Sequence, residues 1–244
     1  MTLVFVHAIL FIGAFLQGVT GMGFALIVGP VLLLVMGDGT AIQIAGLLSL
    51  AIALALIPGF YRHIDGQAMR NFCLSGVIVL PLGLLLFALA EPVHLKLGAG
   101  LFIAVMVGGV FLGLSQAMGR PGRTTDLVAG TFGGIFGGAL SMPGPPIAMR
   151  LATGQLPKVA IRATILGLFV VIYPLIFAGQ ALVAGLEAAT LWSALAYTPA
   201  TLAGAIAGHL AVPYVSEDLF RRVVIGFQIA TAASLLADVA RTGF

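Results

Sequence analysis

The apolar residues of this chain come in long runs separated by short polar or charged segments. A helix that spans a membrane needs about 20 mainly apolar residues to cross about 30 Å of hydrocarbon. Six runs have this length and predict spanning helices at residues 40–60, 71–90, 95–116, 158–179, 187–212 and 218–238. The pattern therefore predicts an all-α polytopic membrane protein.

Two further apolar stretches do not fit a single span. Residues 2–36 are interrupted by Gln17–Gly23, and residues 124–153 are interrupted by Gly137–Pro146. As one helix, the first stretch would be about 50 Å long, too long for one crossing and too short for two. Glycine and proline weaken a helix interior, so each stretch is predicted to form two half-helices that meet at an unwound tip. In lipid, such a break survives only where it is buried in protein or lines a wet cavity.

The two halves of the chain repeat at a nearly constant offset of about 120 residues. The matching positions are Gly18-x3-Met22 with Gly138-x3-Met142, Ala41-Ile42-Gln43 with Ala160-Ile161-Arg162, and Pro81 with Pro199. Because the offset is shared and close to half the chain length, it indicates a duplication. We expect a first membrane repeat at residues 1–118 and a second at residues 119–244.

The basic residues distinguish two topologies, because cytoplasmic loops carry an excess of lysine and arginine. If each broken stretch returns to its starting side, one side holds Arg62, Arg70, Arg120, Arg123, Arg150, Lys158, Arg162, Arg221 and Arg222. The other side then holds only Lys96 and Arg241, whereas full crossings would leave no bias. The re-entrant arrangement leaves three full crossings per half, so we predict inverted-topology repeats with both termini outside the cytoplasm. Such repeats with paired broken helices recur in secondary transporters.

Composition excludes several other classes of protein. The chain is 61% hydrophobic and 8% charged, against about 25% charged residues in a soluble domain. Its net charge of +3 comes from loop residues rather than from a patch that would bind nucleic acid. Cys73 is the single cysteine and the four histidines are scattered, so we expect no disulfide, no metal site and no cofactor. No phosphate-binding Gly-x4-Gly-Lys-Ser/Thr stretch occurs, and we predict that the protein is not an enzyme.

Candidate chemistry is concentrated at the two tips. Pro145 and Pro146 suit the first turn of a helix, and each half-helix that starts at a tip would expose backbone N–H groups and a positive dipole end. Two such ends would favour an anion. The alternative is that the tip glycines serve only close helix packing. The candidate substrate-binding residues are Gln17, Gly18, Thr20, Gly21, Gly23, Gln43, Ser141, Pro143, Gly144, Pro145 and Arg162.

Four charged or titratable residues leave alternatives open. Arg162 could neutralise an anionic substrate with its fork of donors, or extend to the membrane interface. Arg150 is expected at the interface. His7 and His209 lie within apolar segments, where a histidine either relays protons or is a hydrogen-bonded packing residue.

The strings GVTGMGFALIVGPVLLL and GGIFGGALSMPGPPIAMRLATG resemble the TauE/SafE family of sulfite and organosulfonate exporters. Chain length and duplicated halves match as well, so the resemblance covers essentially the whole chain. It implies transport of small anions, often sulfur-containing, across a bacterial inner (plasma) membrane. The residues and the resemblance together predict a secondary transporter of sulfite, organosulfonates or related oxyanions that works by alternating access.

The expected partners are a small anionic solute and the lipid bilayer, without nucleic acid. A proton and the membrane potential are both candidate driving forces, and a homodimer is a candidate assembly. The alternative functions are a passive anion channel, a carrier of small carboxylates and a non-catalytic membrane subunit.

Overall fold

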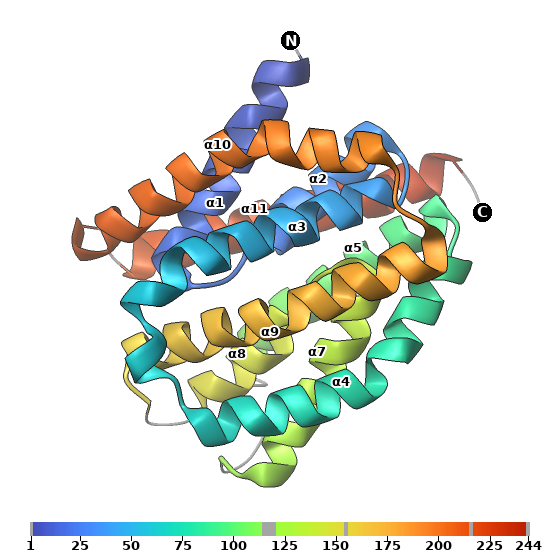
Figure 1. Cartoon of the computed structure of the whole chain (residues 1–244). Helices are drawn as coiled ribbons and strands as arrows, with labels where there is room; N and C mark the ends of the chain where they lie inside the picture. The colour runs from blue at the N-terminus through green and yellow to red at the C-terminus, as the bar shows by residue number, and fades with distance from the viewer. Residues whose placement is uncertain (1, 114–120, 154–155, 215–216, 243–244) are drawn as a thin grey trace.

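The computed structural model describes residues 2–113, 121–153, 156–214 and 217–242, and every regular element in these ranges is helical (Figure 1). The α-helices are α1 Thr2–Thr20, α2 Phe24–Met36, α3 Thr40–Leu56, α4 Gly66–Leu89, α5 Pro92–Phe111, α7 Arg123–Leu140, α8 Gly144–Ala152, α9 Lys158–Ala184, α10 Ala188–Ala211 and α11 Glu217–Thr242. Short 3₁₀ segments are η1 Ile57–Gly59, η2 Tyr61–His63 and η3 Val212–Tyr214.

Five of the predicted spans are confirmed as helices that are long and apolar enough to cross a membrane. They are Thr40–Gly59, Gly66–Leu89, Pro92–Gly109, Lys158–Ala184 and Ala188–Tyr214. The sixth predicted span, 218–238, falls within α11, where the side chains up to residue 224 lie outside the described part of the chain. The expected boundary between the repeats, at residues 118 and 119, also lies outside it.

Both predicted interruptions are present. α1 ends at Thr20 and α2 begins at Phe24, and the residues between them include Gly21 at φ 86° and Gly23 at φ 109°. These left-handed conformations suit glycine, which has no Cβ to clash with the backbone. α7 and α8 are separated by a turn that starts at Ser141, at φ 53°, the one non-glycine residue with positive φ in the described ranges. Prolines occupy the first turn of α8, as predicted.

Each broken stretch consists of a longer first helix, the long arm, and a shorter second helix, the short arm. This difference in length departs from the predicted pairs of half-helices. α1 has 19 residues and α7 has 18, whereas α2 has 13 and α8 has 9. At about 1.5 Å per residue, α1 is about 28 Å long, close to the full hydrocarbon thickness. The difference arises because the glycines that end α1 and α7 lie beyond the middle of each stretch.

α3 and α9 form the centre of the bundle. They lie against each other and run in opposite directions (Figure 1). In an apolar 18-residue window of the spans that contain them, 61% and 67% of the residues are buried, against 39% or less in the corresponding windows of the other three candidate spans. Apolar residues lie on most sides of these two helices, as expected of helices enclosed by others.

The long arms pack closely against helices of the opposite half, α1 on α10 and α7 on α4. Glycines permit the approach: a Cβ built on Gly208 would overlap the Phe15 carbonyl oxygen, and one built on Gly134 would overlap the Gly76 carbonyl oxygen. Small residues at helix crossings are typical of membrane bundles, where van der Waals contact drives association.

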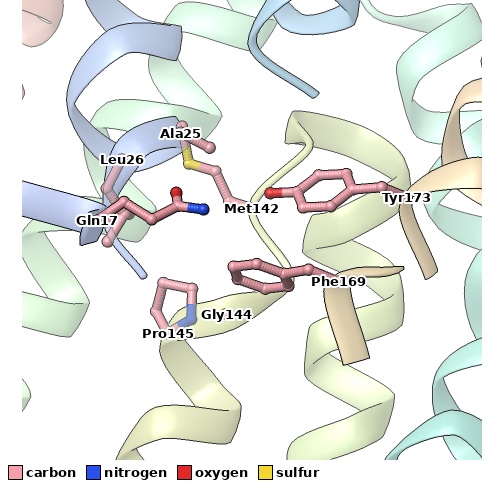
Figure 2. A pocket seen from close by; sticks show the side chains of 9 residues that line it. Gln17, Ala25, Leu26, Met142, Gly144, Pro145, Phe169 and Tyr173 are labelled. Atoms are coloured by element: carbon pink, nitrogen blue, oxygen red, sulfur yellow. The ribbon is translucent and has the colours of Figure 1, made fainter. Parts of the chain in front are cut away.

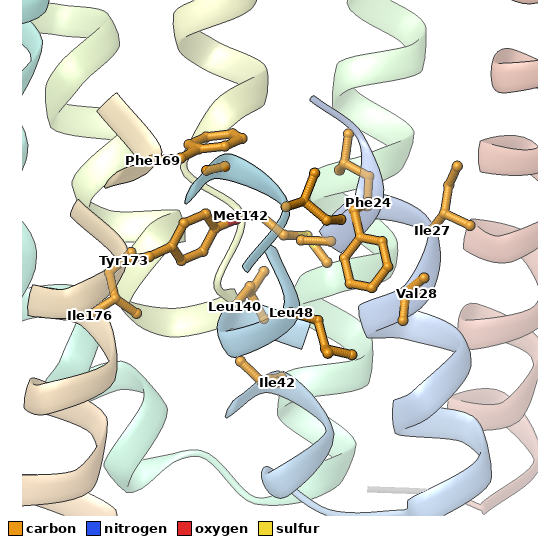
Figure 3. Packing of buried hydrophobic residues seen from close by; sticks show 14 of the residues in the cluster. Phe24, Ile27, Val28, Ile42, Leu48, Leu140, Met142, Phe169, Tyr173 and Ile176 are labelled. Carbon is orange, nitrogen blue, oxygen red and sulfur yellow. The ribbon is translucent and has the colours of Figure 1, made fainter. Parts of the chain in front are cut away.

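Both breaks are enclosed by one apolar core (Figure 3). Phe24 from the start of α2, Met142 from the second break and Tyr173 from α9 all contribute buried side chains to it. Ile42 and Leu48 of α3 close the same cluster. The fold thus satisfies the requirement that irregular backbone at membrane depth be covered by protein.

Candidate anion-binding site

The two breaks lie next to each other against α9. A Cβ built on Gly144 at the start of α8 would be 2.9 Å from Cζ of Phe169 and 3.7 Å from Cβ of Met22 in the first break. A Cβ built on Gly29 of α2 would be 3.4 Å from Cε of Met142 in the second break. Residues about 120 positions apart are therefore brought within side-chain contact.

Gln17 is the polar side chain at this junction. It lies on α1 one turn before the break and is 1% exposed. Its Oε1 accepts a hydrogen bond of 3.2 Å from the N–H of Phe24, the first residue of α2. Its Nε2 is buried without a hydrogen-bond partner and points toward Met142, among the side chains that line a small cavity (Figure 2). Because a buried donor without an acceptor costs about 1–3 kcal/mol, this amide marks a place where a ligand or water is needed.

The space that Nε2 faces is a small cavity of about 10 Å³. Its volume has room for about one water molecule. The cavity is lined by Gln17, Gly23, Ala25, Leu26, Met142, Gly144, Pro145, Phe169 and Tyr173.

The helix starts at the cavity do not contribute equally. Ala25 and Leu26 lie in the first turn of α2, where N–H groups have no carbonyl one turn earlier in the helix. The positive end of the α2 dipole adds to these donors. The first turn of α8 contains Pro145 and Pro146, which carry no N–H. The two tips were predicted to act alike, but the donors come mainly from the first half of the chain.

One face of α9 supports the ends of both long arms. Tyr173 donates its hydroxyl to the Ser141 carbonyl oxygen at 3.1 Å. Gln180 donates from Nε2 to the Gly138 carbonyl oxygen at 3.0 Å and lies 3.4 Å from Oγ of Ser141. The last carbonyl groups of a helix have no partner within it, and here α9 supplies partners for those of α7.

Arg162 has the corresponding place at the end of α1. Its guanidinium donates to the Gly18 carbonyl oxygen, lies 3.1 Å from Nδ1 of His209 and stacks 4.3 Å from the centroid of the Phe60 ring. Its Nε is buried without a hydrogen-bond partner, and the residue is 7% exposed. A cation at the negative end of a helix is favourable. The buried guanidinium therefore caps α1, and its expected role in neutralising an anionic substrate stays a prediction.

The remaining tip candidates shape the breaks. The Thr20 hydroxyl oxygen lies within hydrogen-bond distance of two carbonyl oxygens, those of Leu16 at 2.8 Å and Met22 at 2.6 Å, and its one hydrogen can be donated to either of them within the turn. A Cβ built on Gly21 would be 2.6 Å from Cγ of Arg162. Pro143 immediately precedes α8. These groups are used within the protein and do not line the cavity.

Gln43 lies away from the other candidates. Its Nε2 donates to the Gly185 carbonyl oxygen at 3.0 Å. It lines a larger cavity of about 340 Å³, together with Thr40 and Glu187, near the start of α3 and the end of α9. Gln43 and Arg162 occupy matching positions in the repeat, but antiparallel α3 and α9 place them at opposite ends of the bundle.

Several residues of the site were not predicted. Phe169, Tyr173 and Met142 line the cavity, but nothing in the local sequence separates them from the other apolar positions of the chain. Gln180 could have been recognised as a residue with a specific hydrogen-bond partner, because an amide within a spanning helix is uncommon and needs a partner.

Arg150, which was expected at the interface, is buried within the protein, and its depth in the membrane stays a prediction. Its guanidinium is buried and lies 2.6 Å from Oδ1 of Asp126, whose Oδ2 accepts from Nδ2 of Asn71 at 2.9 Å. The ion pair joins α7 to α8 and so stabilises the second broken stretch. The pairing across the break could not be read from the spacing of the residues.

A multi-pass bundle in which two broken helices meet at a small cavity faced by a buried amide has the arrangement that recurs in membrane transporters. The model of the family described as "Sulfite exporter TauE/SafE" matches residues 6–235, so the chain belongs to this family, which is a family of transporters and not of enzymes. The chain is 28% identical over 240 residues to a protein from Cupriavidus necator named "Probable sulfite/organosulfonate exporter TauE", covering 94% of this chain and 92% of that protein. No solved structure matches the chain significantly.

Proposed function

We propose that this protein is a secondary transporter that moves small sulfur oxyanions, such as sulfite and organosulfonates, by alternating access. The observation that carries the proposal is the unpartnered Nε2 of buried Gln17, which faces a cavity at the start of α2. The name of the relative from Cupriavidus necator supports the class of substrate.

The chemistry of the cavity favours an acceptor-only ligand. Gln17 offers N–H donors from its side chain, and the first turn of α2 offers N–H donors from the backbone. No lining residue is acidic, so nothing would repel an anion. Sulfite and sulfonate oxygens accept several hydrogen bonds at once, and charge-assisted hydrogen bonds of this kind are the stronger ones.

The arrangement of the helices supports two inverted repeats, α1–α5 and α7–α11. Exchanging the halves converts the α1–α10 contact into the α7–α4 contact, and it returns the α3–α9 contact to itself. Corresponding helices such as α3 and α9 run in opposite directions in Figure 1. With the excess of basic residues on one side, we infer that both termini lie outside the cytoplasm of a bacterial inner membrane.

The size of the cavity supports a carrier rather than an open channel. A cavity of about 10 Å³ is too small for sulfite, so the two breaks must separate for the anion to enter. The larger cavity beside Gln43 is a candidate approach from one side of the membrane. Counterflow of labelled sulfite in proteoliposomes tests this point, because exchange accelerated by unlabelled sulfite on the opposite side requires a carrier.

The binding site is tested by thermal stabilisation of the purified protein with sulfite, sulfoacetate, thiosulfate and lactate. A ligand at 100 times its dissociation constant stabilises the folded state by about 2.7 kcal/mol. We expect stabilisation by the sulfur oxyanions and its loss in Gln17→Glu, which keeps the acceptor for the Phe24 N–H but replaces the donor that faces the cavity.

Gln43→Glu is the matched control, because it places the same charge on another buried glutamine outside this cavity. It should retain the response to sulfite. Equal stabilisation of wild type and Gln17→Glu would remove Gln17 from the site and contradict the proposal.

A further inference from the structure

Arg162 holds together three parts of the chain that are far apart in sequence. We use the term Arg162 cap for its contacts with the Gly18 carbonyl oxygen and with Nδ1 of His209. Gly18 belongs to α1, His209 to α10 and Arg162 to α9. The Phe60 ring between η1 and η2 contacts both of these side chains, with centroid distances of 4.3 Å to the guanidinium carbon and 5.4 Å to the imidazole.

The cap defines the protonation state of His209. An arginine side chain has N–H donors and no acceptor, so Nδ1 of His209 must be the acceptor in their 3.1 Å contact. The imidazole is then neutral, with its hydrogen on Nε2. A proton taken from water by Nδ1 would remove the acceptor and place two cations side by side. Protonation of His209 and the Arg162 cap therefore exclude each other.

Few other charged groups face His209 from the elements packed against α10. α3 has no titratable side chain, and α1 has only His7, which contacts the Tyr197 ring more than three turns away along α10. η3 also packs against α10 and carries exposed Tyr214. η2, which packs against α9, carries exposed Arg62 and His63, and α9 carries exposed Lys158 besides Arg162. The side chains of residues 215–224 lie outside the described part of the chain. Among the described groups, Arg162 is thus the charge that a proton on His209 would meet directly.

We propose that His209 is the proton-binding residue that couples protons to the anion site. Its protonation releases Arg162 from Gly18 and so frees the end of α1. Gln17 precedes Gly18 in the chain, so movement of this end displaces the donor that faces the cavity. The coupling to an anion rests on the proposed function, whereas the competition between proton and cap does not.

The competition can be measured as exposure of the first break, without any anion present. In a Cys73→Ala background, Met22→Cys places a thiol in the half-buried break. Its rate of reaction with a methanethiosulfonate reagent is compared with and without His209→Asn, from about pH 8 to about pH 5. Asparagine puts an amide oxygen in the place of Nδ1, so it can accept from Arg162 but cannot be protonated. Thiol ionisation affects both proteins equally, and the ratio of their rates isolates His209.

We expect the ratio of the labelling rate with His209 to the rate with His209→Asn to be close to one at about pH 8. It should rise about tenfold as the pH falls to about 5, which is the change expected for loss of one charge-assisted hydrogen bond. His7→Asn is the control and should leave the pH dependence unchanged. The same comparison is repeated in an Arg162→Gln background as a second test. Without the cation, the ratio between the rates with His209 and with His209→Asn should no longer depend on pH. A ratio between the rates with His209 and with His209→Asn that stays constant from about pH 8 to about pH 5 would overturn the proposal.

Stabilisation by sulfite is measured separately on the same proteins. If sulfite binds but labelling does not depend on His209, only the proton site is wrong. If labelling depends on His209 but no sulfur oxyanion binds, only the proposed substrate is wrong.

Discussion

Replacement of Arg162 by methionine separates a structural cap from an anion ligand. Methionine keeps an unbranched side chain that can pack beside Gly21 and the Phe60 ring, and it removes the guanidinium. The Gly18 carbonyl oxygen and Nδ1 of His209 then lose their donor. We expect the folded protein to become less stable even when no anion is present.

The magnitude follows from the contacts. A hydrogen bond to a charged group contributes about 1.5–3 kcal/mol, and a cation–π contact contributes about 0.5–2 kcal/mol. The loss is partly offset, because methionine also removes a buried charge whose Nε has no hydrogen-bond partner. A net loss of about 2–3 kcal/mol corresponds to a fall in Tm of roughly 5–10 °C, at about 2–4 °C per kcal/mol.

The assay uses Cys73, the single cysteine, which is half-buried and reacts with a fluorogenic thiol dye as the protein unfolds. Arg70→Met is the control, because Arg70 is exposed and should shift Tm little. If Arg162→Met unfolds at the wild-type temperature but no longer responds to sulfite, Arg162 contacts the anion directly and the cap argument is refuted.

Two glycine substitutions test the cavity and the helix packing. Gly144→Ala would put a methyl group 2.9 Å from the Phe169 ring at the cavity. Because overpacking costs about 1–3 kcal/mol, we expect the affinity for sulfite to fall about tenfold or more. An unchanged affinity in a sulfite titration would place the anion elsewhere. Gly208→Ala would overlap the Phe15 carbonyl oxygen and force α1 from α10, lowering Tm by several degrees. Gly98→Ala enters open space and should leave Tm unchanged or raise it, so equal effects of these two variants would contradict the packing argument.

The amino-acid sequence by itself determined the helical spans and the positions of the breaks. Spanning length depends on a count of consecutive apolar residues, which the chain displays directly. The break between α1 and α2 follows from glycines such as Gly21, whose φ of 86° suits a residue without Cβ, and the start of α8 follows from Pro145 and Pro146. These are local properties of the backbone, so local sequence was sufficient.

Only the tertiary structure decided which side chains share a site. Gln17 faces the cavity, Gln43 lies beside a different one, and Arg162 caps α1 rather than facing the cavity. The partners of Arg162 and Tyr173 are carbonyl oxygens 144 and 32 residues away. A hydrogen bond depends on which helices meet and at what height along their axes, and no pattern within one helix specifies its neighbour.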